Sequence, residues 1–396
     1  MEFLKNALDK VRPNFEKGGK LEKYLPAFDA METFMFVPGH TANSGAHIRD
    51  GIDMKRTMIT VVLAMIPCLL FGIWNAGHQH YLALGQFLNP ADGLSEKLIF
   101  GMIKVLPIVV VAYGAGLTVE FIAAIIRKEQ VNEGFLVSGM LIPLVMPIDV
   151  PLWMVAVATI FAVIIGKEVF GGTGMNIMNP ALTARAFLFF AYPTKMSGDS
   201  VWVDSAPQAG EAVVDAYSGA TPLAQAIENG NNVTAVNQDP LSFMDMFFGF
   251  MPGSIGETST LACLIGAFIL LVTGIGSWRI MFSVFAGGAV MAMIFNAVAV
   301  NPFMEVDAQT QLVMGGFAFG AVFMATDPVT AAQTNTGKYI YGFLIGFLAI
   351  MIRVFNPAYP EGMMLAILFM NVMAPLIDHY VVQANIKRRL SRVKTA

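Results

Sequence analysis

The sequence has 396 residues, of which 56% are hydrophobic and only 13% are charged. A soluble domain usually carries roughly 25% charged residues, so the composition argues against a soluble globular enzyme, and the 31 phenylalanines argue against a disordered protein. The formal net charge of −4 gives no reason to expect a nucleic-acid partner.

The chain begins with a polar segment of mixed charge, residues 1–56, which predicts a cytoplasmic extension rather than a cleaved leader. Apolar runs follow at about 57–77, 98–126, 135–151, 152–170, 178–192, 258–277, 280–300, 311–326, 339–355 and 361–380. A polar stretch at 193–256 separates the fifth run from the sixth, and a basic tail occupies 381–396. Since about 20 apolar residues span a bilayer, we expect an all-α polytopic membrane protein with about ten transmembrane helices.

The distribution of basic residues predicts the orientation in the membrane. An even number of spans places both termini on one side, and with both termini in the cytoplasm 19 of the 24 Lys and Arg residues fall on the inner side. The 193–256 stretch then forms an outer, periplasmic loop, which carries seven acids and one lysine. This pattern follows the positive-inside rule and predicts cytoplasmic termini.

Two short motifs recur in the second half of the chain. Asn179-Pro180-Ala181 returns as Asn356-Pro357-Ala358, and Glu133-Gly134-Phe135 resembles Gly315-Gly316-Phe317, at offsets of 177 and 182 residues. Five spans in each half, at 57–192 and 257–380, would make two inverted repeats with interrupted helices, an arrangement that places binding sites near the midplane. The alternative is that such pairs recur by chance in a glycine-rich membrane protein.

The outer loop contains Asp215-Ala216-Tyr217-Ser218-Gly219-Ala220-Thr221. From the residue types alone, this stretch is a small flexible turn that presents a hydroxyl group, and such a threonine usually has no role beyond the turn.

The motif nevertheless resembles the flavinylation motif Asp-x-x-Ser-Gly-Ala-Thr of membrane flavoproteins, and further stretches extend the resemblance to the B subunit of the sodium-translocating NADH:quinone reductases. These stretches are Gly166–Gly174, Asn179-Pro180-Ala181 with Arg185-Ala186-Phe187, Pro252–Glu257, Phe323–Pro328 and Asn356–Met364. The resemblance covers essentially the whole chain. The D subunit of the Rnf complexes shares the flavin motif but generally lacks so long an N-terminal extension, which makes it the second alternative.

The resemblance implies that Thr221 carries FMN through a phosphoester, with the redox chemistry left to the flavin ring. Asp215, Ser218, Gly219 and Ala220 would complete the motif read by a flavin transferase. A structural role in the turn is equally open for Asp215 and Ser218.

A second, non-covalent flavin, riboflavin, is also implied by the resemblance. A flavin ring needs amide donors and acceptors at its edge, and Asn176 and Asn179 at the entry to the fifth span could supply them. The alternative is that these asparagines cap the helix while the neighbouring glycines allow close packing.

Carboxylates inside apolar runs are candidates for a Na⁺ pathway, because a charge at the bilayer centre costs roughly 2.5–3.5 kcal/mol. Glu120, Asp327 and Asp378 all lie toward the predicted cytoplasmic ends of their spans. The alternative is that each pairs with a nearby cation, such as Arg127 two helical turns from Glu120.

The quinone site is the least defined part of the sequence. The resemblance implies that ubiquinone is reduced at this subunit, and Gly114 and Gly116 on the second span could let a flat headgroup approach the backbone. The same small residues are more often a groove for helix packing.

The remaining expectations concern partners and other classes of protein. NADH should bind another subunit, since no strand–glycine-rich turn–helix unit is visible, and the implied partners are an NADH-oxidising flavoprotein, an FMN-bearing subunit and small membrane subunits. Two cysteines, Cys68 and Cys263, are too few for a four-thiolate cluster or zinc site, which leaves buried thiols or a disulfide. The five histidines form no obvious haem pair, whereas a non-redox transporter or channel with inverted repeats remains the rival from another class.

Overall fold

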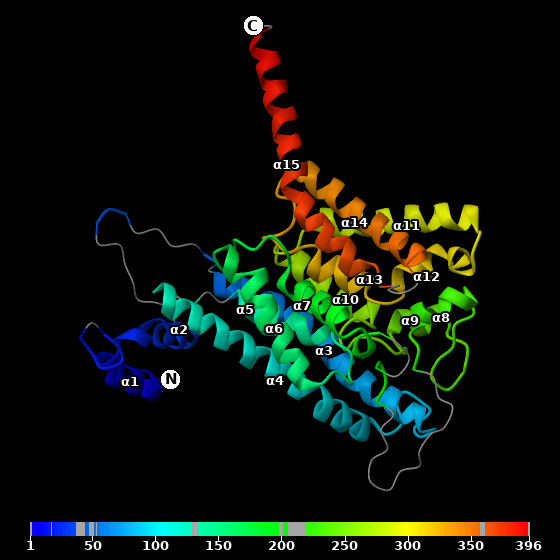
Figure 1. Cartoon of the computed structure of the whole chain (residues 1–396), viewed down its shortest axis with the longest axis horizontal. Helices are drawn as coiled ribbons and strands as arrows, with labels where there is room; N and C mark the ends of the chain where they lie inside the picture. The colour runs from blue at the N-terminus through cyan, green and yellow to red at the C-terminus, as the bar shows by residue number, and fades with distance from the viewer. Residues whose placement is uncertain are drawn as a thin grey trace.

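Helices build the described part of the chain, apart from one isolated β-bridge between Thr234 and Pro240 (Figure 1). The structure is a computed structural model, and it describes residues 2–16, 18–36, 44–46, 51–52, 54–128, 131, 134–197, 201–204, 219–356 and 361–394. The all-α prediction is therefore confirmed for these residues.

Six helices are long and apolar enough to cross a membrane. They are α3 (Met54–Ala83), α4 (Leu94–Arg127), α6 (Leu152–Gly166, continued by η3, Glu168–Phe170), α11 (Trp278–Val298), α14 (Asn335–Phe355) and α15 (Met363–Lys394). Three shorter apolar helices lie among them: α5 (Phe135–Leu144), α7 (Pro180–Ala191) and α10 (Thr260–Val272). Every apolar run predicted from the sequence overlaps a helix, which confirms an integral membrane protein.

The remaining elements are short. They are α1 (Glu2–Val11), η1 (Arg12–Asn14), η2 (Glu22–Tyr24), α2 (Leu25–Met35), η4 (Pro193–Lys195), α8 (Pro222–Asn229), α9 (Phe243–Phe248), η5 (Pro302–Glu305), α12 (Ala308–Val313), α13 (Phe317–Phe319) and η6 (Gly320–Met324). The eighth predicted span is thus divided among α12, α13 and the π-helical η6, with a break at Met314–Gly316.

The short helices begin where a side chain satisfies the free backbone N–H groups. Asn179 caps α7, Thr221 caps α8 and Ser259 caps α10, each by accepting hydrogen bonds from backbone nitrogens of the first turn. Proline at the first position of α7 and α8 removes one further donor. In an apolar environment an unpaired N–H is costly, so these caps make helix starts possible at a break in the chain.

Two glycines bring α11 and α14 into backbone contact. A Cβ atom at Gly287 would collide with the carbonyl of Phe343, and one at Gly346 would collide with the carbonyl of Val284. Small residues let two helices approach closely, and the resulting van der Waals contacts hold the helices together where lipid provides no hydrophobic driving force. The interface between these two helices is the closest packing seam of the second half.

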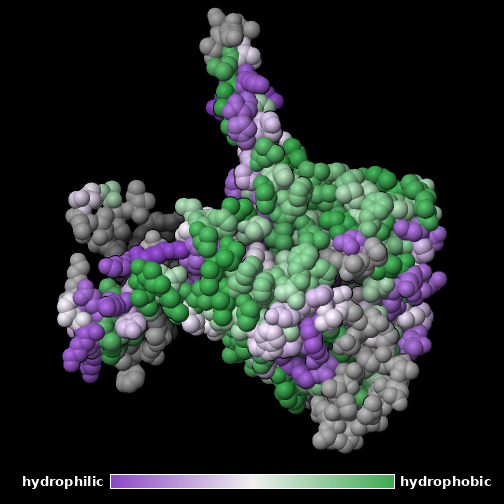
Figure 2. Space-filling view, viewed as in Figure 1, coloured by the Kyte–Doolittle hydropathy of each residue, from purple (hydrophilic) through white to green (hydrophobic). Residues whose placement is uncertain are grey.

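The outer surface follows the membrane character of the fold. Figure 2 shows apolar side chains over the helical body and hydrophilic side chains on the projecting end of α15. The predicted basic tail is therefore a helical continuation of α15 up to Lys394, which stands away from the other helices (Figure 1).

The two cysteines are free thiols at the contact between α3 and α10. The Sγ atoms of Cys68 and Cys263 are 3.8 Å apart, and both residues are buried. The buried-thiol alternative is confirmed, and the disulfide alternative is wrong for this structure.

Candidate functional site

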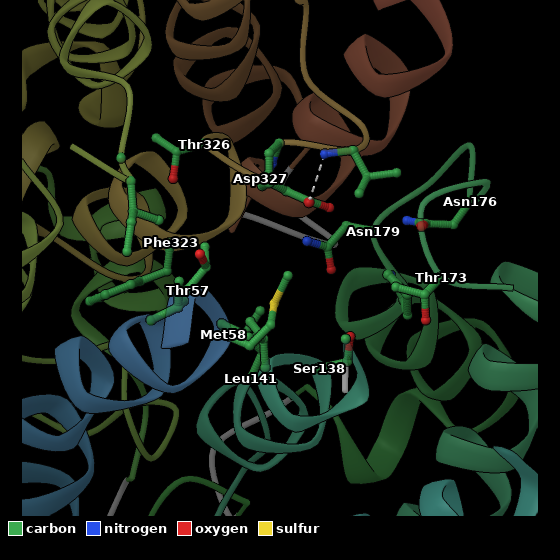
Figure 3. A pocket seen from close by; sticks show the side chains of 18 of the residues that line it. Thr57, Met58, Ser138, Leu141, Thr173, Asn176, Asn179, Phe323, Thr326 and Asp327 are labelled. Atoms are coloured by element: carbon green, nitrogen blue, oxygen red, sulfur yellow. Dashed lines mark hydrogen bonds between the residues drawn. The ribbon is translucent and has the colours of Figure 1, made fainter. Parts of the chain in front are cut away.

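An open cavity, lined by residues from both halves of the chain, lies where the two halves meet (Figure 3). Its walls come from α3, α5, the α6–α7 connection, the end of α10 and η6. They are formed by Thr57, Met58, Val61, Gly134, Val137, Ser138, Leu141, Lys167, Thr173, Asn176, Asn179, Pro180, Leu270, Ile275, Gly276, Phe323, Thr326, Asp327, Pro328 and Val329.

Asn176 and Asn179 both line this cavity. The Oδ1 atom of Asn179 accepts from the backbone nitrogens of Ala181 (2.9 Å) and Leu182 (3.4 Å), which leaves its Nδ2 group without a hydrogen-bond partner among the described residues. Asn176 Nδ2 donates to the carbonyl of Met178 at 3.2 Å, and its Oδ1 atom remains as an acceptor. Asn179 therefore caps α7, as the alternative interpretation held, and still presents a donor to the cavity.

Two charged residues line the cavity, a cation and an anion. Lys167, the residue that ends α6, pairs with Glu120 on α4, and both residues are buried, at 3% and 4% exposed. Arg127 instead pairs with Glu168 at 2.9 Å. The sequence therefore suggested the right kind of partner for Glu120 but the wrong residue, because a partner from another helix cannot be read from spacing along one helix.

Asp327 and Asp378 lie on either side of the segment that connects η6 to α14. Asp327 lines the cavity and accepts from the backbone nitrogen of Val329 at 3.1 Å and from the Thr330 hydroxyl at 3.0 Å. Asp378 on α15 accepts from the backbone nitrogens of Thr334 (3.0 Å) and Gln333 (2.6 Å). Both carboxylates thus fix this connection, and Asp378 holds the start of α14.

Gly114 and Gly116 have different surroundings although both lie on α4. A Cβ atom at Gly114 would meet no heavy atom within 4 Å. At Gly116 it would lie 2.5 Å from both Cε atoms of Phe135 and nearer still to Cζ. The fully buried Phe135 ring occupies the groove at Gly116, so a quinone headgroup cannot approach the backbone there unless the ring moves.

Thr221 lines a second, smaller cavity between α8 and the loop before α10. It is half-buried at the N-terminus of α8, where its Oγ1 accepts from the backbone nitrogen of Ala224 at 3.3 Å. Gln225 holds the preceding residue by donating to the Ala220 carbonyl at 3.1 Å. The flexible, exposed turn expected from the sequence is therefore wrong for Thr221 itself, while Asp215 and Ser218 lie outside the described residues.

A buried ionic cluster forms part of this second cavity and was missed by sequence reasoning. Arg185 on α7 donates to Glu257 at 2.7 Å and to the Ser254 hydroxyl at 3.3 Å, and it pairs with Glu361 at 3.4 Å. Arg185 and Glu257 are at most 5% exposed. The available signal was one arginine inside an apolar run, which requires a partner wherever it is buried.

Metal ligands do not cluster in the part of the chain that the structure describes: it contains no group of three or more His, Cys, Asp and Glu side chains suited to a metal ion. The polar groups of the two cavities are instead amides, hydroxyls and ion pairs. Such groups suit an organic cofactor with polar edges.

Comparisons with known proteins show what the sequence of the chain is similar to. Residues 41–387 match the family described as NQR2, RnfD, RnfE. The chain is 49% identical to the B subunit of the Na(+)-translocating NADH-quinone reductase of Chromohalobacter salexigens, over 98% of this chain and 96% of that protein. It is 49% identical to the B subunit of the Pseudomonas aeruginosa reductase, over 98% and 99% of the two chains, and 48% identical to that of Azotobacter vinelandii, over 97% and 98%.

Proposed function

Because the chain belongs to the NQR2, RnfD, RnfE family, we propose that it is the B subunit of a membrane complex that transfers electrons from NADH to quinone and moves Na⁺ across the membrane. The observation that carries this proposal is the near-complete alignment with proteins named as that subunit. A non-redox transporter or channel has no such support, because the matching proteins are named as reductase subunits.

An Rnf-type D subunit is the second candidate, since the same family includes RnfD. Copurification separates the two. Affinity purification of the chain from bacterial inner membranes is expected to bring down an NADH-oxidising flavoprotein, an FMN-bearing subunit and small membrane subunits, and the preparation should reduce ubiquinone with NADH in a Na⁺-dependent manner. Recovery of a ferredoxin-oxidising assembly instead would contradict the assignment.

We further propose that the chain crosses the membrane ten times in two inverted repeats. One observation supports this directly: Phe135, at the start of α5, packs against Gly116 of α4, and Phe317, at the start of α13, packs against Gly288 of α11. The neighbours also correspond, since α4 packs on α6 and α6 on α7, while α11 packs on α14 and α14 on α15. The second Asn-Pro-Ala motif adds no support, because residues 357–360 lie outside the described residues.

We propose that both termini lie in the cytoplasm, so that the larger cavity faces the cytoplasmic side and the smaller cavity faces the periplasmic side. Thr221 then lies toward the periplasm, while Asn176, Asn179 and Lys167 lie toward the cytoplasm, beside the Arg127–Glu168 pair. The excess of Lys and Arg near the proposed inner ends supports this assignment. Fusion of a reporter that is active on only one side, after Lys394, tests it.

We propose that Thr221 is the attachment residue for covalent FMN. Its hydroxyl is held at a helix N-terminus, which favours a negatively charged phosphate, and the residue is half-buried beside the smaller cavity. A flavin transferase would add the group, reading the motif that includes Asp215, Ser218, Gly219 and Ala220. Once bound, the flavin supplies one- and two-electron chemistry.

The test of the attachment uses in-gel fluorescence of the denatured subunit. Thr221→Val should abolish the flavin signal, because the hydroxyl is removed. Ser242→Ala is the matched control: Ser242 also caps a short helix near this region, α9, so its loss removes a cap without removing the acceptor. A persistent signal in Thr221→Val would contradict the proposal.

We propose that riboflavin binds in the larger cavity. Its walls provide what a flavin ring needs: the free Nδ2 donor of Asn179, the Oδ1 acceptor of Asn176, and apolar contacts from Leu141 and Phe323 (Figure 3). The chain's part in the reaction is to hold the ring between its two halves and to orient it. Electrons would pass from the FMN on Thr221 to this site and then to ubiquinone.

Na⁺ and quinone positions follow as narrower proposals. Asp327 lines the larger cavity, Asp378 holds the segment between Asp327 and α14, and Glu120 pairs with a residue of the same cavity, so we propose these three carboxylates as oxygen ligands for Na⁺. The quinone headgroup would approach α4 at Gly114, which has free space beside it, with Gly116 contributing only if the Phe135 ring moves.

A further inference from the structure

The short helix α9 presents apolar side chains outward. Phe243, Met244 and Phe248 are 37%, 58% and 39% exposed. The one charged residue of this helix, Asp245, is used in the capping box with Ser242, where it accepts from the backbone nitrogen at 3.0 Å. The outward face of α9 therefore consists of two phenylalanines and a methionine, and an exposed apolar patch of this kind marks contact with another apolar surface.

The height of α9 in the membrane follows from its contacts with α3. The ring of Phe248 stacks on Phe250 with 5.9 Å between the ring centroids, and Phe250 meets Trp74 of α3 at 5.7 Å. Trp74 follows Arg56, at the charged end of this span, by 18 residues, which corresponds to about 27 Å of helix. Since the hydrocarbon core is about 30 Å thick, Trp74 and α9 lie close to its opposite boundary.

The apolar surface of α9 continues onto a membrane helix. α9 packs on α10, and a Cβ atom at Gly249, where α9 ends, would lie 2.7 Å from the Cα atom of Ser259, the residue before α10. α10 itself presents Leu261, Leu264 and Ile265 outward. Because helices with apolar side chains on one face lie in the boundary region of a bilayer, the lipids that surround α10 are the fitting neighbours for α9.

We propose that α9 is an interfacial helix whose Phe243, Met244 and Phe248 side chains insert among the lipids at this boundary of the membrane. This contact holds the loop after α9, residues 249–259, at a fixed height. The loop supplies half of the residues that line the smaller cavity, namely Met251, Pro252, Gly253, Ser254, Glu257 and Thr258. The lipid contact thereby fixes the position of the cavity at Thr221 relative to the membrane surface.

The test uses a nitroxide spin label attached to Met244→Cys in the purified complete complex, reconstituted into vesicles of phosphatidylethanolamine and phosphatidylglycerol. The native thiols of Cys68 and Cys263 are buried, so the label is directed to the new site. Oxygen concentrates in the bilayer and a water-soluble nickel chelate stays outside it, so their collision rates with the label report its surroundings. The label at position 244 should collide more with oxygen than with the nickel chelate.

Glu228→Cys is the matched control. Glu228 is an exposed residue of α8, the helix that begins at Thr221, and a label there should collide more with the nickel chelate. The same preference at Met244→Cys would overturn the proposal, because α9 would then face water. Low collision rates with both reagents would also overturn it, because another protein segment would then cover α9. Phe243→Cys provides the same measurement if Met244→Cys does not assemble.

Amide hydrogen exchange tests whether the lipid contact holds the loop. Replacing both Phe243 and Met244 by glutamine removes two lipid contacts, so exchange over residues 249–259 should become faster in the same vesicles. Glu228→Gln, which changes a side chain that faces water, should leave this exchange unchanged. Unchanged exchange in the double variant would overturn the anchoring. Neither measurement depends on FMN, so a failure of the flavin proposal at Thr221 would leave both results as they are.

Discussion

The contact between Gly116 and Phe135 separates a packing role from a quinone-binding role. The change is Gly116→Ala, which places a Cβ atom 2.5 Å from both Cε atoms of the Phe135 ring. Carbon atoms in ordinary contact are about 3.5–4.0 Å apart, so the ring must retreat by at least ~1 Å. Since Phe135 is completely buried, this overpacking should cost about 1–3 kcal/mol.

A double-mutant cycle measures the contact. Phe135→Leu alone leaves a cavity and should destabilise, but in the double variant the shorter side chain makes room for the new methyl group. The two changes should therefore couple by about 0.5–3 kcal/mol, observed as a smaller loss of thermal stability than the sum of the single variants at one fixed scan rate. Additivity within about 0.5 kcal/mol would refute the packing argument.

The kinetics of ubiquinone reduction in the same variants show whether the groove at Gly116 packs helices or binds quinone. If Gly116 acts through Phe135, the KM for ubiquinone should rise in Gly116→Ala and recover in the double variant. If the quinone headgroup instead touches the backbone at Gly116, the added methyl group should raise the KM for ubiquinone in Gly116→Ala and in the double variant alike. Gly288→Ala, the equivalent contact in the second half, also crowds a buried ring, that of Phe317, and should destabilise without changing KM.

Three further predictions concern the two cavities. Asn179→Ser keeps a cap for α7 but removes the Nδ2 donor, so the complex should lose non-covalent flavin on gel filtration while its thermal stability changes little. Arg185→Met leaves Glu257 buried without its partner and should lower the stability of the fold by about 3–5 kcal/mol. The measurement is the yield of assembled complex, and a variant as stable as the wild type would show that water compensates the Glu257 charge. Asp378→Asn keeps an acceptor for the α14 start, so a raised Na⁺ requirement at unchanged stability supports a cation role, and an unchanged Na⁺ requirement contradicts it.

The sequence located the helices well because apolar runs and their breaks are local properties. The predicted run at 98–126 corresponds to α4 at Leu94–Arg127, and the run at 152–170 corresponds to α6 with η3. The break inside the eighth run was not predicted. Gly315 has φ +65° there, but a glycine in an apolar run is equally compatible with a continuous, closely packed membrane helix.

The site was predictable only where one residue type carries the signal. Asn176 and Asn179 were predicted because the resemblance implies a riboflavin and their amides lie at a helix start, and both line the larger cavity; their contact with a flavin stays a prediction. Lys167 was missed as a partner of Glu120, since they are 47 residues apart and belong to different helices. Pairings of this kind depend on how α4 and α6 pack, which no single-sequence pattern encodes.

The interrupted helices place capping side chains at both of the proposed cofactor sites. A helix that starts at a break needs a side chain to accept from its first N–H groups, and Asn179, Thr221 and Ser259 meet that need at α7, α8 and α10. Two of these capping side chains, Asn179 and Thr221, also line the two cavities, whereas Ser259 is buried. Evolution of a binding site at such a break therefore requires no additional buried polar group: the remaining donor of Asn179 and the hydroxyl of Thr221 are present already as consequences of the helix caps.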